Sequence, residues 1–274
     1  MQKERVIPIT SVTSTPRMRA EVYGISARIP RSIFGGQTEL QHIAAPSGIT
    51  RLYLPKLWQI QRRIINTNDP LKWALCGSGG NGTVGLYISR DNCHGALLQP
   101  EEGSAVMLIT RDCPTVVITD PQTGKILVLH VGRDQLHTIP PPRTCTPACP
   151  IGDSIIEAGM KAWSANPRTL HVDMLCGIGA ANFPNRWKHP ENGDFYRKVT
   201  QYLTGKYGSG AVVGDPEEGH LDLPYIIRAA LERLGVPGEH IRHDGLDTFA
   251  HPECASARRD NGGHYRNGVL VRCV

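Results

Sequence analysis

The chain has 274 residues, of which 40% are hydrophobic and 20% charged, proportions typical of a soluble globular protein. Its formal net charge of +5 suits an anionic ligand such as phosphate, but the basic residues are spread along the chain, which argues against a nucleic-acid-binding surface. No apolar run approaches the roughly 18 residues that a membrane span needs, and the stretch 1–21 lacks the apolar core of a signal peptide. We therefore expect a cytoplasmic protein with reduced thiols and with no membrane or nucleic-acid partner.

In chain order, residues 1–20 are expected to be an irregular N-terminal lead-in, and residues 21–274 a single domain. Apolar residues at helical spacing predict helices within 54–65, 153–163 and 220–236, the second capped by Asp153 or Ser154. Strands are predicted within 20–30, after the glycine-rich turn in 76–89, and within 104–113, 170–179 and 268–274. Because strands and helices do not alternate strictly, the pattern favours an α+β fold of mixed β-sheets flanked by helices.

The segment 110–130 predicts a β-hairpin with a cysteine and a histidine at its open end. Its strands, 115–120 and 125–130, flank the turn "PQTG", and pairing Asp120 with Lys125 places Thr115 opposite His130. Cys113 then lies at the same end as His130. The two side chains suit a metal site, a nucleophile with its base, or the structural end of a buried hairpin. Lone cysteines and histidines are most often structural.

Six short segments occur in an order typical of one family. They are 23–28 ("YGISAR"), 92–95 ("NCHG"), 110–114 ("TRDCP"), 129–133 ("LHVGR"), 175–179 ("LCGIG") and 254–260 ("CASARRD"). Together they resemble the motifs of the laccase-domain, or YfiH-type, proteins, and the resemblance covers the chain from about residue 20 to its end. Members of that family are described as polyphenol oxidoreductases and as purine nucleoside phosphorylases that also deaminate adenosine.

The resemblance implies a layered αββα fold and a metal site formed by His94, Cys113 and His130. Zinc is the expected metal and copper the alternative, since two histidines and a thiolate leave a fourth position open. The implied ligands are a purine nucleoside or related heterocycle and phosphate, and the implied assembly is a monomer or small homo-oligomer. Asp112, next to the cysteine, would orient a ligand or accept a proton. Four arginines are the candidates for binding phosphate: Arg28, Arg133, Arg258 and Arg259.

The sequence also departs from the family pattern. The Trp-Arg-Gly expected after the hairpin histidine is missing, Tyr23 replaces the histidine of the first motif, and Cys254 and Ala255 replace a pair of aromatic residues. These changes suggest an altered substrate or a lost reaction. The alternatives are therefore a cysteine hydrolase or deamidase in which Cys113 attacks and His130 is the base, a non-catalytic binding protein, and a copper-dependent polyphenol oxidase.

Two further patterns are weaker. The segment 77–82 satisfies G-x-G-x-x-G, but a strand and not a helix is predicted after it, which argues against a dinucleotide site. Cys145, Cys149 and the nearby His137 have only a loose zinc-like spacing within the proline-rich loop 137–150.

Overall fold

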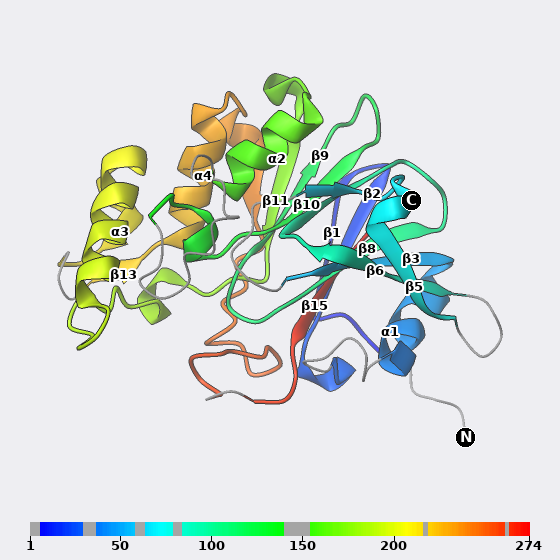
Figure 1. Cartoon of the computed structure of the whole chain (residues 1–274), viewed down its shortest axis with the longest axis horizontal. Coiled ribbons are helices and arrows are strands. Elements are labelled where there is room, and N and C mark those ends of the chain that lie inside the picture. Colours follow the sequence, from blue (N-terminus) through cyan, green and yellow to red (C-terminus); the bar gives the residue numbers. More distant parts are fainter. Residues whose placement is uncertain are drawn as a thin grey trace.

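The computed structural model describes residues 6–29, 37–57, 64–78, 84–139, 154–215, 219–260 and 263–274. Two mixed β-sheets carry helices on their outer sides (Figure 1). The α-helices are α1 (Gln37–Ala44), α2 (Ile155–Trp163), α3 (Gly193–Tyr207) and α4 (Leu223–Arg233). None of the helices in the described ranges is long and apolar enough to cross a membrane.

The larger sheet has seven strands. Their spatial order is β1 (Thr10–Thr15), β2 (Met18–Tyr23), β15 (Asn267–Cys273), β8 (Ser104–Thr110), β3 (Arg51–Lys56), β6 (Gly85–Asn92) and β5 (Trp73–Ser78). β3 runs parallel to both of its neighbours, and the other pairs are antiparallel. The last strand, β15, lies between β2 and β8, so the C-terminal segment is an interior part of this sheet.

The second sheet has six strands. Their order is β14 (Ile241–His243), β11 (His171–Leu175), β9 (Thr115–Thr119), β10 (Ile126–His130), β7 (Gly95–Leu98) and β4 (Ile64–Asn66). The two outer pairs are parallel and the inner pairs antiparallel. A separate two-stranded ribbon joins β12 (Val212–Val213) to β13 (His220–Leu221).

Three hydrophobic clusters define the layers. One lies between the two sheets, where Val106 and Leu108 of β8 share a cluster with Val117 of β9 and Val128 of β10. A second contains residues of α2, α3 and α4 together with the outward side chains of the six-stranded sheet, and a third contains residues of α1 with the outer face of the seven-stranded sheet. The layers therefore follow the αββα order implied by the family resemblance, and the predicted α+β class is confirmed.

The predicted hairpin is confirmed with its register. Thr115 of β9 pairs with His130 of β10, and Thr119 pairs with Ile126. Side chains alternate along both strands: Val116 and Ile118 belong to the helix-covered cluster, whereas Val117 belongs to the cluster between the sheets. Both faces are buried, and shifting the register by one residue would exchange them, so packing fixes the position of His130.

Two sequence predictions are wrong. A helix was expected within 54–65, but residues 51–56 form strand β3 and residues 64–66 form strand β4. Both ends of the expected helix are therefore strands, and residues 58–63 lie outside the described residues. A short apolar run buried on both faces cannot be distinguished from a helix by periodicity alone. The lead-in expected at 1–20 also differs, because Thr10–Thr15 form β1 and β2 begins at Met18.

The other two predicted helices are confirmed. Ser154 caps α2 through a reciprocal pair of hydrogen bonds, in which Glu157 N donates to Ser154 Oγ (3.2 Å) and Ser154 N to Glu157 Oε2 (2.7 Å). Helix α4 lies within the predicted range 220–236, although His220 and Leu221 belong to strand β13. Asp222 caps the helix, and its carboxylate accepts a hydrogen bond from Tyr225 N at 2.9 Å.

Candidate active site

Cys113 lies on a short crossing between the two sheets. β8 of the larger sheet ends at Thr110, and β9 of the smaller sheet begins at Thr115. Two hydrogen bonds hold the crossing in place: the Thr110 side-chain Oγ1 donates to the Cys113 carbonyl (2.9 Å), and Ile178 N donates to the Asp112 carbonyl (2.9 Å). The two sheets thus fix the thiol at the junction of their strand ends.

His94 and His130 lie against each other at this junction. His94 immediately precedes β7, His130 ends β10, and His130 N donates to the His94 carbonyl at 2.8 Å. Their Nδ1 atoms are 2.9 Å apart, and the rings are stacked with centroids 5.1 Å apart. Burial, reinforced by His94, lowers the pKa of His130 to about 3, so its imidazole is neutral at physiological pH.

Cys113 is half-buried, and its thiol lies against the turn after β10. A Cβ at Gly132 would lie 2.7 Å from Cys113 Sγ and 2.7 Å from Gln135 Oε1, so this close approach requires a glycine. Burial and the negative charges of Asp134 and Asp112 raise the pKa of Cys113 to about 12. In the metal-free protein the cysteine is therefore a protonated thiol.

The donor set fits a metal ion in part. Two imidazole nitrogens on one tetrahedral zinc ion lie about 3.3 Å apart for Zn–N bonds of roughly 2.05 Å, and the two Nδ1 atoms are at a comparable 2.9 Å. Within the described ranges, however, no three His, Cys, Asp or Glu side chains form a group able to hold a metal ion. The structure thus brings two predicted ligands together and places Cys113 on the wall of the same pocket.

This pocket has a volume of about 600 Å³ and is rich in arginine. Its polar and aromatic lining consists of Arg111, Arg133, Arg186, Arg258 and Arg266, Asp112 and Asp134, His94 and His130, Thr110, Cys113 and Gln135, and Phe183 and Tyr196. Five guanidinium groups against two carboxylates give the pocket an excess of positive charge. Such a pocket favours an anionic ligand.

Asp112 organises the C-terminal side of the pocket. Its buried carboxylate accepts hydrogen bonds from Thr248 Oγ1 (3.0 Å), Ala257 N (2.9 Å) and Arg258 N (3.2 Å). With these bonds it ties the crossing loop to the segment 256–260. These contacts position Arg258. The sequence predicts a different role for Asp112, which is to orient a ligand or accept a proton beside the cysteine.

Arg133 and Asp134 form an ion pair in the turn after β10. Arg133 Nε donates to Asp134 Oδ1 at 2.7 Å, and its guanidinium carbon lies 4.6 Å from the centre of the Tyr196 ring. His137 Nε2 lies 3.7 Å from the same carboxylate oxygen. Although burial acts to raise the pKa of Asp134, His137 and Arg133 lower it well below its usual range, so the carboxylate stays ionised.

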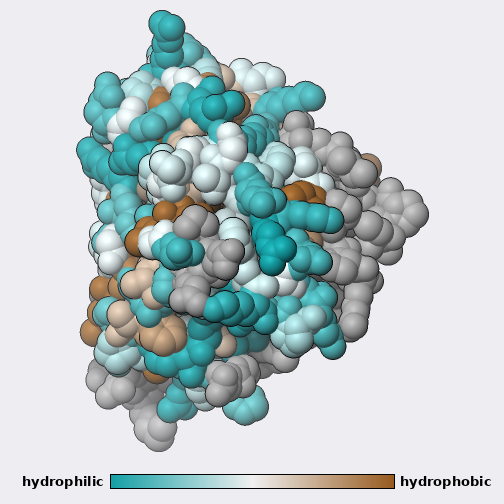
Figure 2. Space-filling model, turned by 90° about the vertical axis from the view of Figure 1, so that its left-hand side faces the viewer, coloured by the Kyte–Doolittle hydropathy of each residue, from teal (hydrophilic) through white to brown (hydrophobic). Residues whose placement is uncertain are grey.

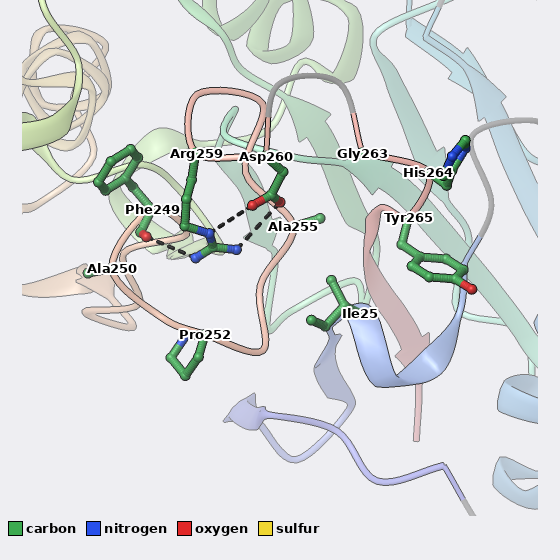
Figure 3. Close-up of a pocket in the computed structure, with 10 residues that line it drawn as sticks. All are labelled: Ile25, Phe249, Ala250, Pro252, Ala255, Arg259, Asp260, Gly263, His264 and Tyr265. Atoms are coloured by element: carbon green, nitrogen blue, oxygen red, sulfur yellow. Dashed lines mark hydrogen bonds and ion pairs between the residues drawn. The ribbon is translucent and has the colours of Figure 1, made fainter.

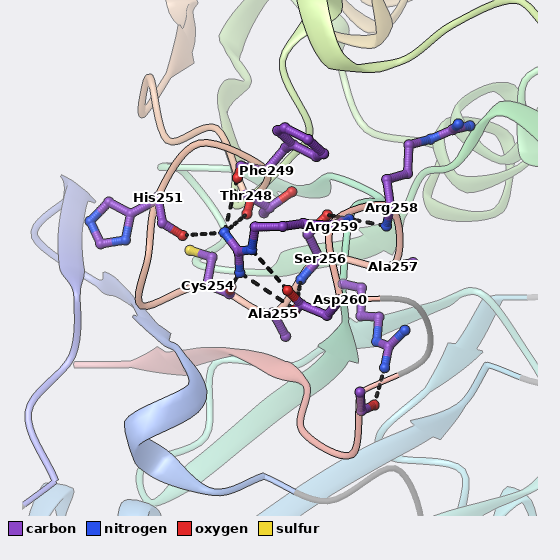
Figure 4. A network of polar contacts seen from close by, with 12 residues as sticks. Thr248, Phe249, His251, Cys254, Ala255, Ser256, Ala257, Arg258, Arg259 and Asp260 are labelled. Carbon is purple, nitrogen blue, oxygen red and sulfur yellow. Dashed lines mark hydrogen bonds and ion pairs between the residues drawn. The ribbon is translucent and has the colours of Figure 1, made fainter.

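The predicted phosphate-binding arginines separate into two kinds. Arg133 and Arg258 line the pocket, and the Arg258 guanidinium lies over Phe183 at 4.6 Å. Arg259 instead donates to the carbonyls of residues 248, 249, 251 and 254 and to Asp260, and Figure 4 shows Arg258 extending away from this network. Its guanidinium is used to fold the loop and does not line the arginine-rich pocket. Arg28 is exposed and does not line it either.

A second, smaller pocket lies beside the Arg259 network. It has a volume of about 530 Å³, and Figure 3 shows Phe249, Pro252, Ile25 and Tyr265 around the Arg259–Asp260 ion pair. Arg259 Nε donates to Asp260 Oδ1 at 2.8 Å. Because this pocket contains neither the cysteine nor the histidine pair, it is separate from the candidate active site.

Several pocket residues were missed by the sequence analysis. Arg111 lies inside the motif 110–114, where the sequence analysis singled out only Asp112 and Cys113. Arg186, Arg266, Phe183 and Tyr196 come from segments without a motif, so only the fold brings them to the site. Phe183 and Tyr196 supply aromatic walls at a pocket for which the sequence indicated a loss of aromatic residues.

The two weaker sequence patterns have no part in this site. Cys145 and Cys149 lie outside the described residues, and His137 belongs to the Asp134 network. The glycine-rich segment 77–82 lies between β5, which ends at Ser78, and β6, which begins at Gly85. Residues 79–83 lie outside the described ranges.

Comparison with known proteins gives a consistent picture. Residues 86–273 match the family model described as multi-copper polyphenol oxidoreductase laccase. The fold is similar to that of the hypothetical protein YfiH of Bacillus licheniformis (TM-score 0.62, 17% identity, 86% of this chain and 79% of that one). It is also similar to YlmD from Geobacillus stearothermophilus (TM-score 0.66, 15% identity, 96% and 94%) and to a Neisseria meningitidis protein of the family DUF152 (TM-score 0.67, 15% identity, 97% and 98%). No curated protein matches the sequence.

The face seen from the left of Figure 1 is largely hydrophilic, with apolar residues in small separate patches (Figure 2).

The family model covers well over half of the chain, including the cysteine crossing, the hairpin and the closing strand. The ordered motifs, the layered fold and this match lead to one conclusion: the chain belongs to the YfiH-type laccase-domain family.

Proposed function

We propose that the protein is a metal-dependent enzyme acting on purine nucleosides, by phosphorolysis, by deamination of adenosine, or by both. One observation carries the proposal: a pocket with five arginines lies directly beside the His94–His130 pair and Cys113. Phosphorolysis requires a bound phosphate dianion next to a nucleoside, and guanidinium groups match its oxygens. A neutral phenol, the substrate class in the family model's description, gives these arginines no role.

His94, His130 and Cys113 would hold the metal, with zinc expected and copper the alternative. Two nitrogens and one sulfur suit either ion and leave one coordination position for water or substrate. When bound, zinc would act as a Lewis acid and lower the pKa of a bound water toward ~7. The neutral state of His130 leaves its ring nitrogen available as a ligand without loss of a proton.

The protein's own groups would bind and orient the reactants. Arg258, which lies over the Phe183 ring, and Arg133, which lies over the Tyr196 ring, would hold phosphate. In phosphorolysis a phosphate oxygen forms a bond to C1′ of the ribose as the bond from C1′ to N9 breaks. The electron pair moves to N9, and the departing purine takes up a proton.

The cysteine hydrolase alternative is disfavoured by the state of the thiol. A nucleophilic cysteine needs a thiolate, which a neighbouring positive charge or a suitable base provides. Here burial and two carboxylates raise the pKa of Cys113 to about 12, and His130 has too low a pKa to form an imidazolium partner. Rapid alkylation of Cys113 in metal-free protein near pH 7 would restore this alternative.

The test combines metal content with turnover. Purified protein is expected to contain about one zinc or copper ion per chain, and to convert inosine with phosphate to hypoxanthine or adenosine to inosine. His94→Ala, His130→Ala and Cys113→Ser should each lower the metal content and reduce turnover by about 100-fold or more. Cys273→Ser and His264→Ala, which lie outside the pocket, are the matched controls. Absence of purine nucleoside turnover with metal bound would contradict the proposed reaction and leave a polyphenol oxidase or a non-catalytic binding protein.

A further inference from the structure

The side-chain amide of Gln135 is a buried hydrogen-bond donor that faces the pocket. Only 6% of the residue's surface is exposed, and it lines the cavity of about 600 Å³. Its Oε1 accepts from Gly132 N at 2.9 Å, whereas its Nε2 has no acceptor among the described residues and is not sealed in the interior. Buried polar groups are nearly always paired, so this NH₂ group is matched by an acceptor on a bound ligand.

The bond to Gly132 decides which end of the amide the ligand meets. If the amide were turned over, Nε2 would oppose Gly132 N, and two donors would face each other. A Cβ at Gly132 would lie 2.7 Å from Gln135 Oε1 and 2.7 Å from Cys113 Sγ, so the amide is held beside the thiol. Gln135 therefore presents donors alone, next to the proposed metal ligands.

The other neutral hydrogen-bonding side chains of the pocket, those of Thr110 and Tyr196, are used within the protein. Thr110 Oγ1 donates to the Cys113 carbonyl at 2.9 Å. Tyr196 is engaged by Arg133 through both its ring and its hydroxyl. The guanidinium groups suit phosphate, and Gln135 is the uncharged donor that remains for an uncharged heterocycle.

The two common kinds of purine differ at the edge that such a donor would meet. A 6-oxopurine has two neighbouring acceptors, O6 and N7, whereas adenine has the acceptor N7 beside a donor, its 6-amino group. A glutamine amide recognises this edge of adenine with both its oxygen and its nitrogen. In Gln135 the oxygen is already used by Gly132 N, so a 6-oxopurine matches the available group and the amino group of adenine does not.

We propose that Gln135 selects the base, and that the preferred substrate class is the 6-oxopurine nucleosides, inosine and guanosine, and not adenosine. This inference rests on the proposed function of the pocket and deepens it, because it favours phosphorolysis over deamination. Deamination converts a 6-amino group into a 6-oxo group. Its product would then be bound more tightly than its substrate, which opposes turnover.

The first experiment compares two uncharged nucleosides on the parent protein. Isothermal titration of the full-length, metal-containing protein without phosphate is expected to show that inosine binds about tenfold or more tightly than adenosine. Absorbance spectra report whether adenosine stays intact. Equal affinities, tighter binding of adenosine, rapid deamination of adenosine, or no binding of either nucleoside would each overturn the proposal.

Gln135→Glu changes the donor into an acceptor at nearly constant shape. One carboxylate oxygen can still accept from Gly132 N, while the other replaces the NH₂ group, so the preference for inosine should disappear and shift toward adenosine. Gln201→Glu, the same change at an exposed position of α3 outside the pocket, is the matched control and should keep the parent preference.

A preference for inosine that is unchanged in Gln135→Glu would argue that another group selects the base and would overturn the assignment. Should this variant fail to fold, Gln135→Met removes the donor without adding a charge, and it should bind inosine and adenosine about equally. A retained preference in Gln135→Met has the same negative meaning.

The result is distinguishable from the test of the proposed function. Turnover of inosine or adenosine without tighter binding of inosine would sustain the proposed function and overturn this inference. Tighter binding of inosine that is lost in Gln135→Glu, without turnover of any purine nucleoside, would support the base-binding role of Gln135 and contradict the enzymatic proposal.

Discussion

At the scale of single residues, neighbouring side chains in the C-terminal motif have opposite roles. Arg258 extends into the pocket, whereas Arg259 binds four carbonyl oxygens and one carboxylate of its own loop. The sequence "SARRD" identifies two adjacent arginines but does not say which one faces a ligand. The difference arises because Asp112 fixes the backbone at Ala257 and Arg258, which sets the directions of both side chains.

Asp112→Asn tests this positioning role. The asparagine keeps the shape but loses the charge that accepts two amide hydrogen bonds and one hydroxyl bond, so the free energy of unfolding should fall by about 2 kcal/mol. Thr248→Val removes only one of these bonds and should cost about 1 kcal/mol. Urea denaturation measures both. Asp194→Asn, at a largely exposed ion pair, is the control and should be nearly neutral. Unchanged stability of Asp112→Asn with lost activity would instead indicate a purely chemical role.

At the scale of elements, α2 is joined to α3 through one carboxylate. Glu157 completes the capping box of α2 and accepts from Lys206 of α3 at 2.8 Å. Burial acts to raise its pKa, but the hydrogen bonds from Lys206 and Ser154 and the charge of Lys206 lower it below 4.5. The folded state therefore binds the proton more weakly than the unfolded state does.

Glu157→Gln should change how stability depends on pH. Because the pKa of Glu157 is lowered on folding, its contribution is fully present above about pH 4.5 and is lost as the pH falls through the folded-state value. At pH 7 the variant should be less stable by about 1 kcal/mol, and the difference from the parent should shrink as the pH falls below about 4.5. Urea midpoints at several pH values measure this. Glu232→Gln, at an exposed pair with Arg228, is the control; a difference independent of pH would argue against the ionic contribution.

The elements also show what the sequence can and cannot predict. The hairpin register and helices α2 and α4 follow from local signals: a turn, a cap and one periodic face. Strand β3 could not be recognised, because both of its faces are buried and its apolar residues are therefore contiguous. The metal-ligand candidates were found through motifs, whereas Arg186, Arg266, Phe183 and Tyr196 have no local signal and reach the pocket through long-range packing.

At the scale of the whole molecule, the pocket connects parts of the chain that are far apart in sequence. Its lining comes from the crossing at 110–113, the turn after β10, helix α3 and the segments around 257 and 266. Repulsion of Arg258 by Arg186 and Arg133 opposes the close approach of these parts when no anion is bound. An anion in the pocket should therefore stabilise the folded protein as a whole.

Inorganic phosphate should raise the unfolding temperature through this pocket. At a phosphate concentration 100 times the dissociation constant, the gain in the free energy of unfolding is about 2.7 kcal/mol. Arg258→Gln should leave the stability without phosphate nearly unchanged, or raise it slightly by relieving repulsion, and should abolish most of the gain. Arg259→Gln should show the opposite behaviour, with lower stability at every phosphate concentration, because its hydrogen bonds hold the loop. Thermal scans at constant ionic strength measure the unfolding temperature of both variants. Because phosphate also stabilises proteins without binding them, only the part of the gain that the parent protein shows and Arg258→Gln does not is assigned to the pocket. An equal gain in the parent protein and in Arg258→Gln would show that phosphate acts elsewhere.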